Sequence, residues 1–291
     1  MVNAVIFDLD GTLADTMDDL MTAINRMLER LGYEKRSKAE LIRFINRGTR
    51  YFVKKSLPEE VQNVDFIVDS GIQAYKEEYE KCYLEKTYAF DGIKEALEGI
   101  KERKIKIAVL SNKPDKFVND ICDKLFGKKF FRAAMGQTNL PTKPDPTAAL
   151  LIAKTMGAKP NKCIIVGDSD VDVRTAQNAD MEFVGVSWGY RSEAVLREAG
   201  AEYIVEDTEG LISAIEAIVR RNNAKKKSVL RNLDNAKAKA LEPKQEEGAN
   251  EDIPLESEQI PLELEDEVAE MPKTAKAGTS IVKSSKRNKT R

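Results

Sequence analysis

Histidine is absent from this sequence of 291 residues. Its absence removes the side chain that most often serves as a general base near neutral pH and as a ligand of transition metals. Any catalysis must therefore rest on carboxylates, lysine, serine, threonine or cysteine. A hard cation with oxygen ligands is the metal that such side chains favour.

Cysteine is scarce, and its positions argue against two kinds of structural site. The three cysteines are Cys82, Cys122 and Cys163, and no two of them have a Cys-x-x-Cys spacing. An odd number without that spacing argues against a disulfide framework and against a structural zinc site. We therefore expect a reducing, cytoplasmic location and cysteines that pack as small apolar side chains.

Long apolar runs are missing as well. The first run, residues 4–7, ends in acids, so the N-terminus does not resemble a signal peptide, and no stretch approaches a membrane-spanning length. The 47 basic and 49 acidic residues give a formal net charge of -2, which favours no nucleic-acid partner. With 42% apolar residues, the chain is expected to be a soluble globular protein with a sizeable core.

The C-terminal part of the chain differs in composition from the rest. The last aromatic residue is Tyr203, and beyond about Arg221 the sequence turns to Lys, Glu, Asn, Pro and Ala. Few large apolar groups remain to offset the entropy of ordering the chain. We therefore predict that residues 222–291 form a disordered charged tail, transiently helical over residues 225–241.

Upstream of the tail, short apolar runs alternate with amphipathic stretches. The runs are of strand length and almost continuously apolar, in residues 4–7, 105–110, 163–166 and 183–186. Such runs indicate parallel strands that are covered on both faces. Helical periodicity lies between them, in residues 91–102, 114–125, 146–156 and 170–179. The pattern predicts an α/β fold with a doubly wound parallel sheet.

Residues 16–87 interrupt this alternation. Four helical segments and no convincing strand are expected there, including residues 18–31, 38–46 and 64–83. The insertion leaves just after the first strand, so a cap over the carboxyl end of that strand is expected. The predicted domains are a core of residues 1–15 and 88–221, a helical cap of residues 16–87, and the tail.

Polar motifs follow the ends of predicted strands or open a helix. They are Asp8-Leu9-Asp10-Gly11-Thr12, Ser111-Asn112-Lys113, Lys143-Pro144 and Gly167-Asp168-Ser169-Asp170-Val171-Asp172. A bare Asp-x-Asp is also compatible with a turn or a helix cap. In an open α/β sheet, however, the strand ends converge on the ligand crevice, so we expect these motifs to lie together there.

These four motifs, in this order, resemble those of the haloacid dehalogenase superfamily, and within it the phosphoglycolate phosphatase-like branch with a helical cap. The resemblance covers about residues 4–220. It implies a phosphatase that hydrolyses a small phosphate monoester, such as phosphoglycolate or a nucleotide or sugar phosphate. The reaction would pass through a phosphorylated aspartate.

The resemblance also implies a role for each motif residue. Asp8 would be the nucleophile, a role that suits a carboxylate because it needs no deprotonation at neutral pH. Asp10, on the same side of an extended segment, would be the general acid and base. The phosphate-binding residues would be Thr12, Ser111, Asn112 and Lys143. Mg²⁺ would be held by Asp8, the backbone carbonyl of Asp10 and Asp168, with Asp172 orienting that shell.

In the cap, Arg47-Gly48-Thr49-Arg50 lies between two predicted helices. In this branch a glycine-containing loop there closes over the substrate, but the expected Gly-x-Gly is Asn46-Arg47-Gly48 here. Arg47, Gly48 and Arg50 are the candidates for substrate specificity, because a guanidinium suits a carboxylate or second phosphate on the substrate.

Other polar residues are expected to be structural. Asp15 and Thr16 are expected to form the N-terminal cap of the first helix in the cap domain. Asp170 is expected to cap the helix that begins directly after it in the sequence. Trp188-Gly189-Tyr190-Arg191 also resembles the branch, and its simpler interpretation is a packed aromatic followed by a surface arginine.

Alternative functions stay open. A phosphosugar mutase uses the same nucleophile, and a pyrophosphatase or nucleotidase has the same fold. A dehalogenase is disfavoured because it needs neither the carboxylate cluster nor the acid of the Asp-x-Asp motif.

An alternative of another class is a tail-mediated interaction protein. Residues 246–270 contain acids but no base, residues 273–291 contain bases but no acid, and Ile-Pro-Leu-Glu occurs at residues 253–256 and again at 260–263. Chance repetition in an acidic stretch of low complexity is the simpler explanation of the repeat.

Overall fold

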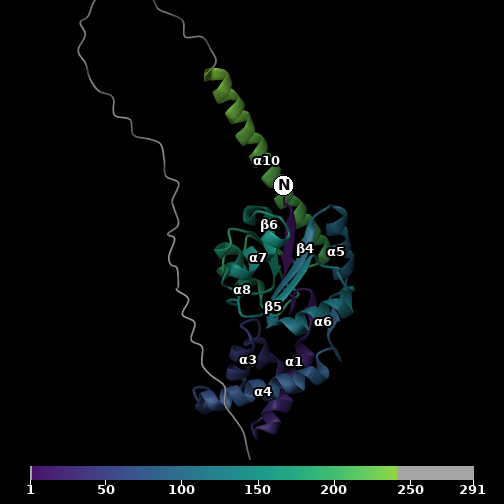
Figure 1. The fold of residues 1–291 in the computed structure, drawn as a ribbon, viewed down its shortest axis with the longest axis vertical. Helices are drawn as coiled ribbons and strands as arrows, with labels where there is room; N and C mark the ends of the chain where they lie inside the picture. The colour runs from purple at the N-terminus through teal and green to yellow at the C-terminus, as the bar shows by residue number, and fades with distance from the viewer. Residues whose placement is uncertain (1, 241–291) are drawn as a thin grey trace, which may run out of the picture. The chain divides into compact units, whose positions relative to one another are not determined.

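The computed structural model describes residues 2–240. Its core is a six-stranded sheet in the order β5-β4-β1-β6-β7-β8 (Figure 1). The strands are β1 (Ala4–Phe7), β4 (Lys106–Pro114), β5 (Ala133–Gln137), β6 (Cys163–Gly167), β7 (Glu182–Val186) and β8 (Tyr203–Val205). Every neighbouring pair is parallel. The predicted α/β fold with a parallel sheet is confirmed.

Helices cover both faces of this sheet (Figure 1). One face packs against α5 (Ile93–Glu102), α6 (Asp115–Phe126) and α10 (Thr208–Ala240). The other packs against α7 (Thr147–Thr155), α8 (Asp170–Asn178) and α9 (Glu193–Glu198). Successive residues of a strand point to opposite faces. Accordingly, Val5 and Phe7 of β1 belong to the first apolar cluster and Ala4 and Ile6 to the second.

Two strands of the sheet, β5 and β8, were not predicted from the sequence. They form the two edges of the sheet. The first reads Ala-Ala-Met-Gly-Gln, and the second is only three residues long. An edge strand has one neighbour and needs no continuous apolar run, so the pattern that reveals central strands is missing from both.

The insertion after β1 is helical, as predicted. Its helices are α1 (Met17–Arg30), α2 (Lys38–Ile42), α3 (Thr49–Ser56) and α4 (Asp65–Cys82), with a 3-10 turn at Glu59–Val61. A two-stranded antiparallel ribbon, β2 (Ala14–Asp15) and β3 (Tyr88–Ala89), joins them to the core. They lie at the carboxyl ends of the core strands (Figure 1).

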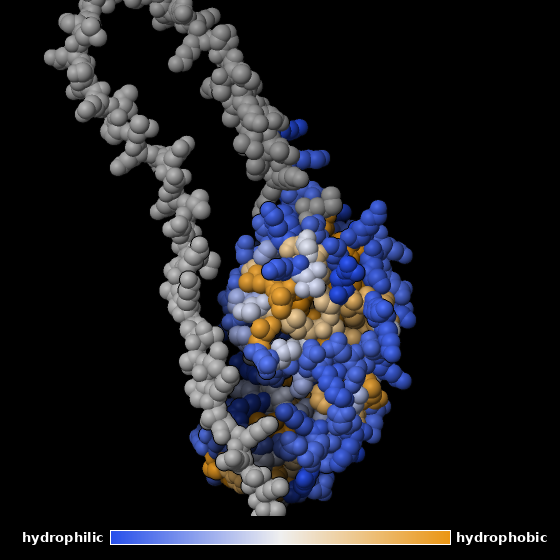
Figure 2. All heavy atoms as spheres, viewed as in Figure 1, coloured by the Kyte–Doolittle hydropathy of each residue, from blue (hydrophilic) through white to orange (hydrophobic). Residues whose placement is uncertain are grey.

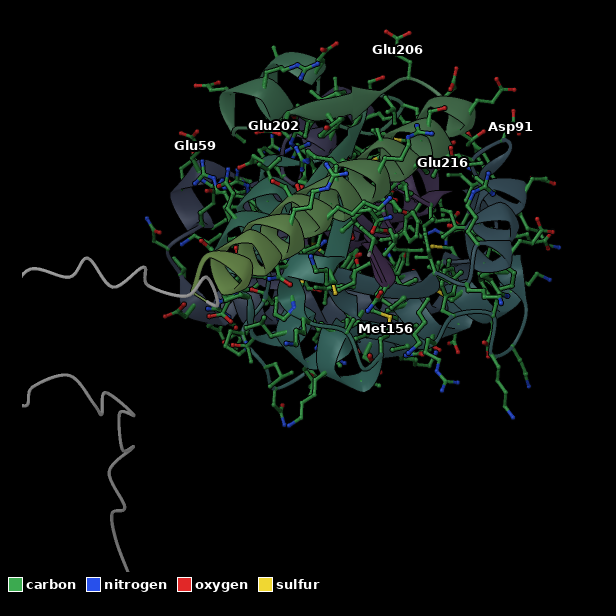
Figure 3. All side chains as sticks on the ribbon, turned by 90° about the horizontal axis from the view of Figure 1, so that it is seen from above. Glu59, Asp91, Met156, Glu202, Glu206 and Glu216 are labelled. Carbon is green, nitrogen blue, oxygen red and sulfur yellow. The ribbon has the colours of Figure 1, made fainter. Side chains whose placement is uncertain are left out.

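The last helix extends past the end predicted for the packed core. That core was expected to end at about Arg221, with transient helix over residues 225–241, and α10 runs continuously to Ala240. Glu216 lies on α10 (Figure 3) and pairs with Arg103, which directly follows α5. Arg221 pairs with Glu182 at the start of β7. Ala, Leu, Lys and Arg are strong helix formers, and their frequency beyond Arg221 allows the helix to continue. The rest of the predicted tail, with its charge blocks and repeats, lies outside the described residues.

The surface seen in Figure 2 is mostly hydrophilic. The large apolar side chains that are exposed among the described residues are few, and they are Val64, Phe66, Tyr88, Leu150 and Leu151. Among residues 2–240, no helix combines the length and the apolar character needed to cross a membrane.

The three cysteines are free and buried, which matches the structural role expected of them. Burial raises the pKa of Cys82 and of Cys163 to about 11 and that of Cys122 to about 12. Thiols in such surroundings are neutral at physiological pH and react slowly, because the thiolate is the nucleophile.

We therefore expect native protein at pH 7.5 to resist alkylation by iodoacetamide. The measurement is the mass of the intact protein over time, before and after unfolding in guanidinium chloride. Unfolded chain should gain three adducts within minutes. Rapid modification of any cysteine in the native protein would contradict the buried placement.

Candidate active site

The carboxyl ends of the central strands bring the predicted motifs together. Asp8 directly follows β1, Asp168 directly follows β6, and Ser111 lies near the end of β4. Lys143 comes from the loop before α7, and Asp172 lies in the first turn of α8. All five side chains are buried. The structure thus gathers the motifs into one crevice, as expected for the strand ends of an open α/β sheet.

A buried ion-pair network connects three of these residues. The Nζ of Lys143 lies 2.8 Å from Oδ1 of Asp8 and 2.6 Å from Oδ1 of Asp172. Oδ1 of Asp8 also accepts a hydrogen bond of 2.7 Å from the backbone N–H of Leu9. No donor among residues 2–240 contacts Oδ2 of Asp8. This oxygen is therefore free to meet a ligand.

The Asp172 carboxylate has both of its oxygens engaged. Oδ2 accepts hydrogen bonds from the backbone N–H and the hydroxyl of Ser169, at 3.2 and 2.6 Å, while Oδ1 accepts from Lys143. Ser169 and Asp172 form a capping box, so Ser169 and not Asp170 is the N-cap of α8. A carboxylate fixed at both oxygens suits the orienting role predicted for Asp172.

Carboxylate oxygens of Asp8, Asp168 and Asp172 all lie within 4.8 Å of one another. One ammonium, that of Lys143, contacts this cluster, so three negative charges face one positive charge. Burial, together with the charge of Asp172, raises the pKa of Asp168 to about 7. Burial also raises the pKa of Asp8 well above its ordinary value, against the opposing effect of Lys143. The excess negative charge and the oxygen donors fit a divalent hard cation such as Mg²⁺.

Two glycines allow the backbone to approach Asp168. Gly11 has φ +86, and a side chain there would collide with the Asp168 carboxylate and the Tyr190 ring. A Cβ on Gly189 would meet the Asp168 side chain as well. The backbone N–H of Tyr190 then donates to Oδ2 of Asp168 at 2.6 Å. Glycine is required at both positions because backbone from two loops packs directly on this carboxylate.

Asp10 points away from the carboxylate cluster, toward the cap. Its Oδ1 accepts from the hydroxyl of Thr16 at 2.5 Å and from Nζ of Lys113 at 2.7 Å. Thr16 is the N-cap residue of α1, but its side chain does not form the predicted capping hydrogen bond to that helix. Asp15 instead accepts from the N–H of Met17 at 2.9 Å.

The predicted phosphate-binding residues divide into two groups. Ser111 and Lys143 face the crevice, and the Ser111 hydroxyl accepts from the N–H of Lys113 at 3.3 Å, which leaves its own hydrogen free to donate. Thr12 instead donates its hydroxyl to Asp168 at 3.3 Å. Asn112 donates both hydrogens of its amide, to the carbonyls of Asn46 and Lys143 at 3.0 Å each. Neither Thr12 nor Asn112 has a side-chain hydrogen left for a phosphate.

Asn46, in the cap loop before α3, reaches the core. Its φ is +74, a conformation that favours Gly or Asn. This explains the departure from Gly-x-Gly, because asparagine tolerates the backbone that the first glycine would adopt. Its amide also donates to Asp168 at 3.3 Å. The sequence pattern did not single out Asn46 as a site residue, although its place in the loop was the available signal.

The arginines of the cap loop lie elsewhere. Arg47 pairs with Asp170 at 3.1 Å, on the rim between cap and core. Arg50 pairs with Asp65 and Asp69 of α4, and its side chain is 55% exposed. The structure does not bring Arg50 to the crevice. Arg191, expected at the surface, is only partly exposed and donates to backbone carbonyls of the cap, including that of Ile45 at 3.0 Å.

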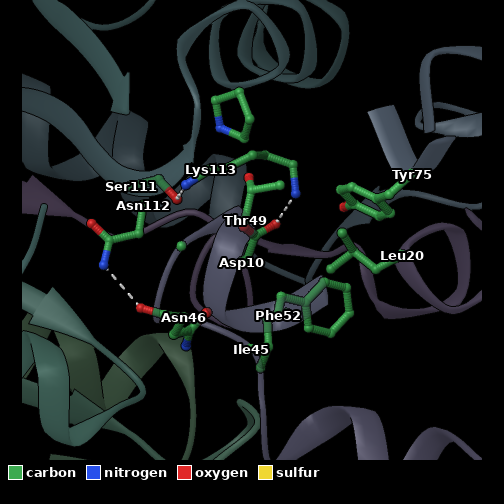
Figure 4. A pocket seen from close by; sticks show the side chains of 12 residues that line it. Asp10, Leu20, Ile45, Asn46, Thr49, Phe52, Tyr75, Ser111, Asn112 and Lys113 are labelled. Carbon is green, nitrogen blue, oxygen red and sulfur yellow. Dashed lines mark hydrogen bonds and ion pairs between the residues drawn. The ribbon is translucent and has the colours of Figure 1, made fainter. Parts of the chain in front are cut away.

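A small pocket lies between the cap and the core (Figure 4). Its volume is about 40 Å³, and it is partly open to solvent. Its lining combines apolar side chains of the cap with polar side chains of the core, and Gly48 and Thr49 contribute the start of α3. Asp10, Asn112 and Lys113 form the core side of the pocket.

Comparison with known proteins identifies the family. A family model described as haloacid dehalogenase-like hydrolase matches residues 5–186, which is more than half of the chain. The chain belongs to the haloacid dehalogenase-like hydrolases. Its predicted membership, fold and enzyme class, a phosphatase of this family, are thereby confirmed.

Relatives of this hydrolase include a phosphoglycolate phosphatase of Pseudomonas fluorescens, 30% identical over 212 residues that cover 72% of this chain and 78% of the relative. Another, from Psychrobacter arcticus, is 29% identical over 225 residues, covering 75% of this chain and 98% of the relative. Among solved structures, a protein named "putative phosphoglycolate phosphatase" from Lactobacillus delbrueckii subsp. bulgaricus is 30% identical, with a TM-score of 0.69 over 74% of this chain and 98% of that one.

Lys113 is a buried lysine in the crevice of this hydrolase, and no role was predicted for it from the sequence. Lys113 is the third residue of the Ser-Asn-Lys motif and still belongs to β4, which extends to Pro114. The available signal was its place directly after Ser111 and Asn112 in a motif at the end of a predicted strand.

The raised pKa of Asp8 leads to a prediction for stability. The pKa of Asp8 is higher in the folded protein than in the unfolded protein. As the pH rises from the unfolded-state pKa through the folded-state pKa, ionisation of Asp8 therefore lowers the stability of the metal-free fold. Asn at this position keeps the acceptor for Leu9 and Lys143 and carries no charge. We expect Asp8→Asn to raise the Tm in EDTA by roughly 2–4 °C at pH 8, equivalent to about 1 kcal/mol, and by less at pH 5.

Calorimetry of the wild type and the variant at both pH values tests this expectation. Asp123→Asn, on the exposed face of α6, is the matched control and should leave the Tm unchanged at either pH. A lower Tm for Asp8→Asn at pH 8 would show that the charged form stabilises the metal-free site.

Proposed function

We propose that this hydrolase is a Mg²⁺-dependent phosphatase that transfers the phosphoryl group of a small monoester to Asp8 and then to water. One observation carries the proposal. Asp8 has one oxygen held by Leu9 and Lys143 and the other free, at the centre of a buried crevice. A nucleophilic carboxylate needs this arrangement, in which one oxygen is fixed and the other can attack in line.

The first step would form an aspartyl phosphate. Oδ2 of Asp8 attacks phosphorus, the bond from phosphorus to the leaving oxygen breaks, and Asp10 gives that oxygen its proton. Lys143 would balance charge on the phosphoryl oxygens and the Ser111 hydroxyl would donate a hydrogen bond to one of them, a role supported by their positions in the same crevice. Burial alone would lower the pKa of Lys143, but Asp172 and Asp8 outweigh it and raise the pKa, so the ammonium stays charged.

The second step would return the enzyme to its starting state. Asp10, now a carboxylate, accepts a proton from water as the oxygen of that water attacks phosphorus. Inorganic phosphate leaves, and Asp8 regains its free carboxylate. One group serves as acid and then as base because the two steps are chemically the reverse of each other.

Three groups would hold the metal, namely Asp8, the carbonyl of Asp10 and Asp168. When bound, Mg²⁺ would supply positive charge for the transferring phosphoryl group. Contacts within the protein orient the carboxylates that would bind the metal. Tyr190 and Asn46 donate to the Asp168 carboxylate, and Lys143 pairs with that of Asp8.

Phosphoglycolate is the substrate that the relatives favour, since both curated relatives described above are named phosphoglycolate phosphatase. The pocket beside Asp10 supports a small leaving group, because its volume is only about 40 Å³ with the cap in this position. The two-carbon leaving group of phosphoglycolate is smaller than a sugar or a nucleoside.

Asp8→Asn should lose all measurable turnover, because the amide is nearly the same size as the carboxylate but a poor nucleophile. The measurement is release of inorganic phosphate from phosphoglycolate, with circular dichroism as a check of the fold. Retained phosphatase activity in a folded variant would remove Asp8 from its role. An isomerised phosphate ester without phosphate release would instead indicate a mutase.

Chelation provides a separate test of the metal. Enzyme treated with EDTA should be inactive, Mg²⁺ should restore activity, and Ca²⁺ should not. Calcium has a larger and more variable oxygen shell, which would misplace the attacking carboxylate. Full activity with Ca²⁺, or activity that survives chelation, would contradict the proposed site.

A further inference from the structure

Among the residues that line the pocket between cap and core, one is a cation (Figure 4). This residue is Lys113, whose side chain is 2% exposed. Its Nζ lies 2.7 Å from Oδ1 of Asp10 and 5.0 Å from the centroid of the Tyr79 ring. A buried ammonium is costly unless its charge is met, and here one carboxylate and one ring meet it.

The cap contributes mainly apolar side chains to the pocket, so positive charge in the lining comes from Lys113. Leu20, Ile45 and Phe52 supply apolar walls from the cap. Thr49 opens α3, and this helix has no side-chain cap at its start. A helix N-terminus and a buried ammonium both favour an anion, and both contribute to the lining of this pocket.

The arginines expected to recognise the substrate do not supply this charge. Arg47 is directed toward Asp170, and Arg50 toward two acids on the cap surface, so both guanidinium groups lie outside the pocket. An anionic leaving group that enters beside Asp10 would therefore meet Lys113 first.

We propose that Lys113 determines substrate specificity by binding a carboxylate on the leaving group, so that the enzyme selects phosphate esters of short 2-hydroxy acids. The inference rests on the proposed function, in which Asp10 protonates the leaving oxygen. Lys113 contacts Asp10 directly, so its ammonium lies close to the place of that oxygen. In a 2-hydroxy acid, the carboxylate carbon is two bonds from the same oxygen, which puts it within reach of Lys113.

The pocket also limits how far the anion can lie from the ester. Its volume of about 40 Å³ and its apolar walls leave little room for a longer chain between the two groups. A carboxylate that binds Lys113 replaces part of the interaction that the ammonium has with Asp10, so the buried charge stays compensated. A neutral leaving group offers no such replacement and gains nothing from Lys113.

The experiment compares two substrates of nearly equal size. These are phosphoglycolate and 2-hydroxyethyl phosphate, in which a hydroxymethyl group replaces the carboxylate. Wild-type enzyme with Mg²⁺ should prefer phosphoglycolate in kcat/KM. Lys113→Met should lower that preference at least tenfold, which is about 1.4 kcal/mol. Lys113→Arg should keep most of the preference, because it keeps the charge.

Lys116→Met is the matched control, since Lys116 lies on the exposed surface of α6 and pairs with Glu80. It should leave the preference unchanged. Equal losses on both substrates for Lys113→Met would overturn the inference, because they would mean that Lys113 only supports Asp10. No hydrolysis of any monoester by the wild type would instead be a failure of the proposed function.

Binding gives a readout that does not depend on turnover. In the Asp8→Asn background with Mg²⁺, isothermal titration should show phosphoglycolate binding at least tenfold more tightly than 2-hydroxyethyl phosphate, and Lys113→Met should remove the difference. Pyrophosphate is the third ligand, because its leaving group is also anionic. Preference for pyrophosphate over phosphoglycolate in binding and in turnover would overturn the assignment to a carboxylate.

Discussion

The contact of the Lys143 ammonium with the carboxylates of Asp8 and Asp172 is the interaction on which the site depends. Without it, the carboxylates of Asp8 and Asp168, at the ends of two adjacent strands, and that of Asp172, in the first turn of α8, would face each other in a buried crevice, where repulsion is poorly screened. The ammonium fixes one oxygen of Asp8 and thereby decides which oxygen remains free. The proposed chemistry therefore requires Lys143 to be held in position, and contacts with neighbouring segments hold it there.

Asn112 connects that condition to the cap. Its carbonyl oxygen accepts from the backbone N–H of Lys143, while its amide donates to the carbonyls of Lys143 and Asn46. Asn46 in turn donates to Asp168. One side chain of β4 thus holds both the loop that carries the cation and the cap loop. In this arrangement, the cap seals the crevice with the same hydrogen bonds that orient the charged groups.

The central strands of the sheet could be predicted from the sequence, whereas its two edge strands could not. Central strands such as β1 and β6 are apolar on both faces, and this requirement leaves a clear pattern in the residues. The edge strands β5 and β8 lack that requirement, and α10 extends past Arg221 because the residues beyond it have a high helix propensity. Patterning detects burial, so it detects central strands and amphipathic helices but misses short edge strands that are only partly buried.

Within the site, the positions of the strand-end carboxylates followed from the fold, whereas the partners of the hydroxyl and amide donors did not. Asp8 and Asp168 follow buried strands, and strand direction alone gathers them. Whether a hydroxyl or amide faces the substrate or a neighbouring carboxylate depends on side-chain geometry that no spacing encodes. Thr12 illustrates this limit, because it occupies the expected position and yet donates to Asp168.

The same reasoning explains why cations were harder to place than acids. An acid at a strand end has a short side chain and stays near its backbone, so its position follows from the fold. The charged groups of lysine and arginine lie several ångströms from the backbone, so each can form an ion pair with an acid on a neighbouring element. Arg50 finds two acids on the cap surface, whereas Lys113, within a buried strand, can reach Asp10. Where a cation acts is thus decided by which carboxylates the fold leaves unpaired, and this depends on the assembled site.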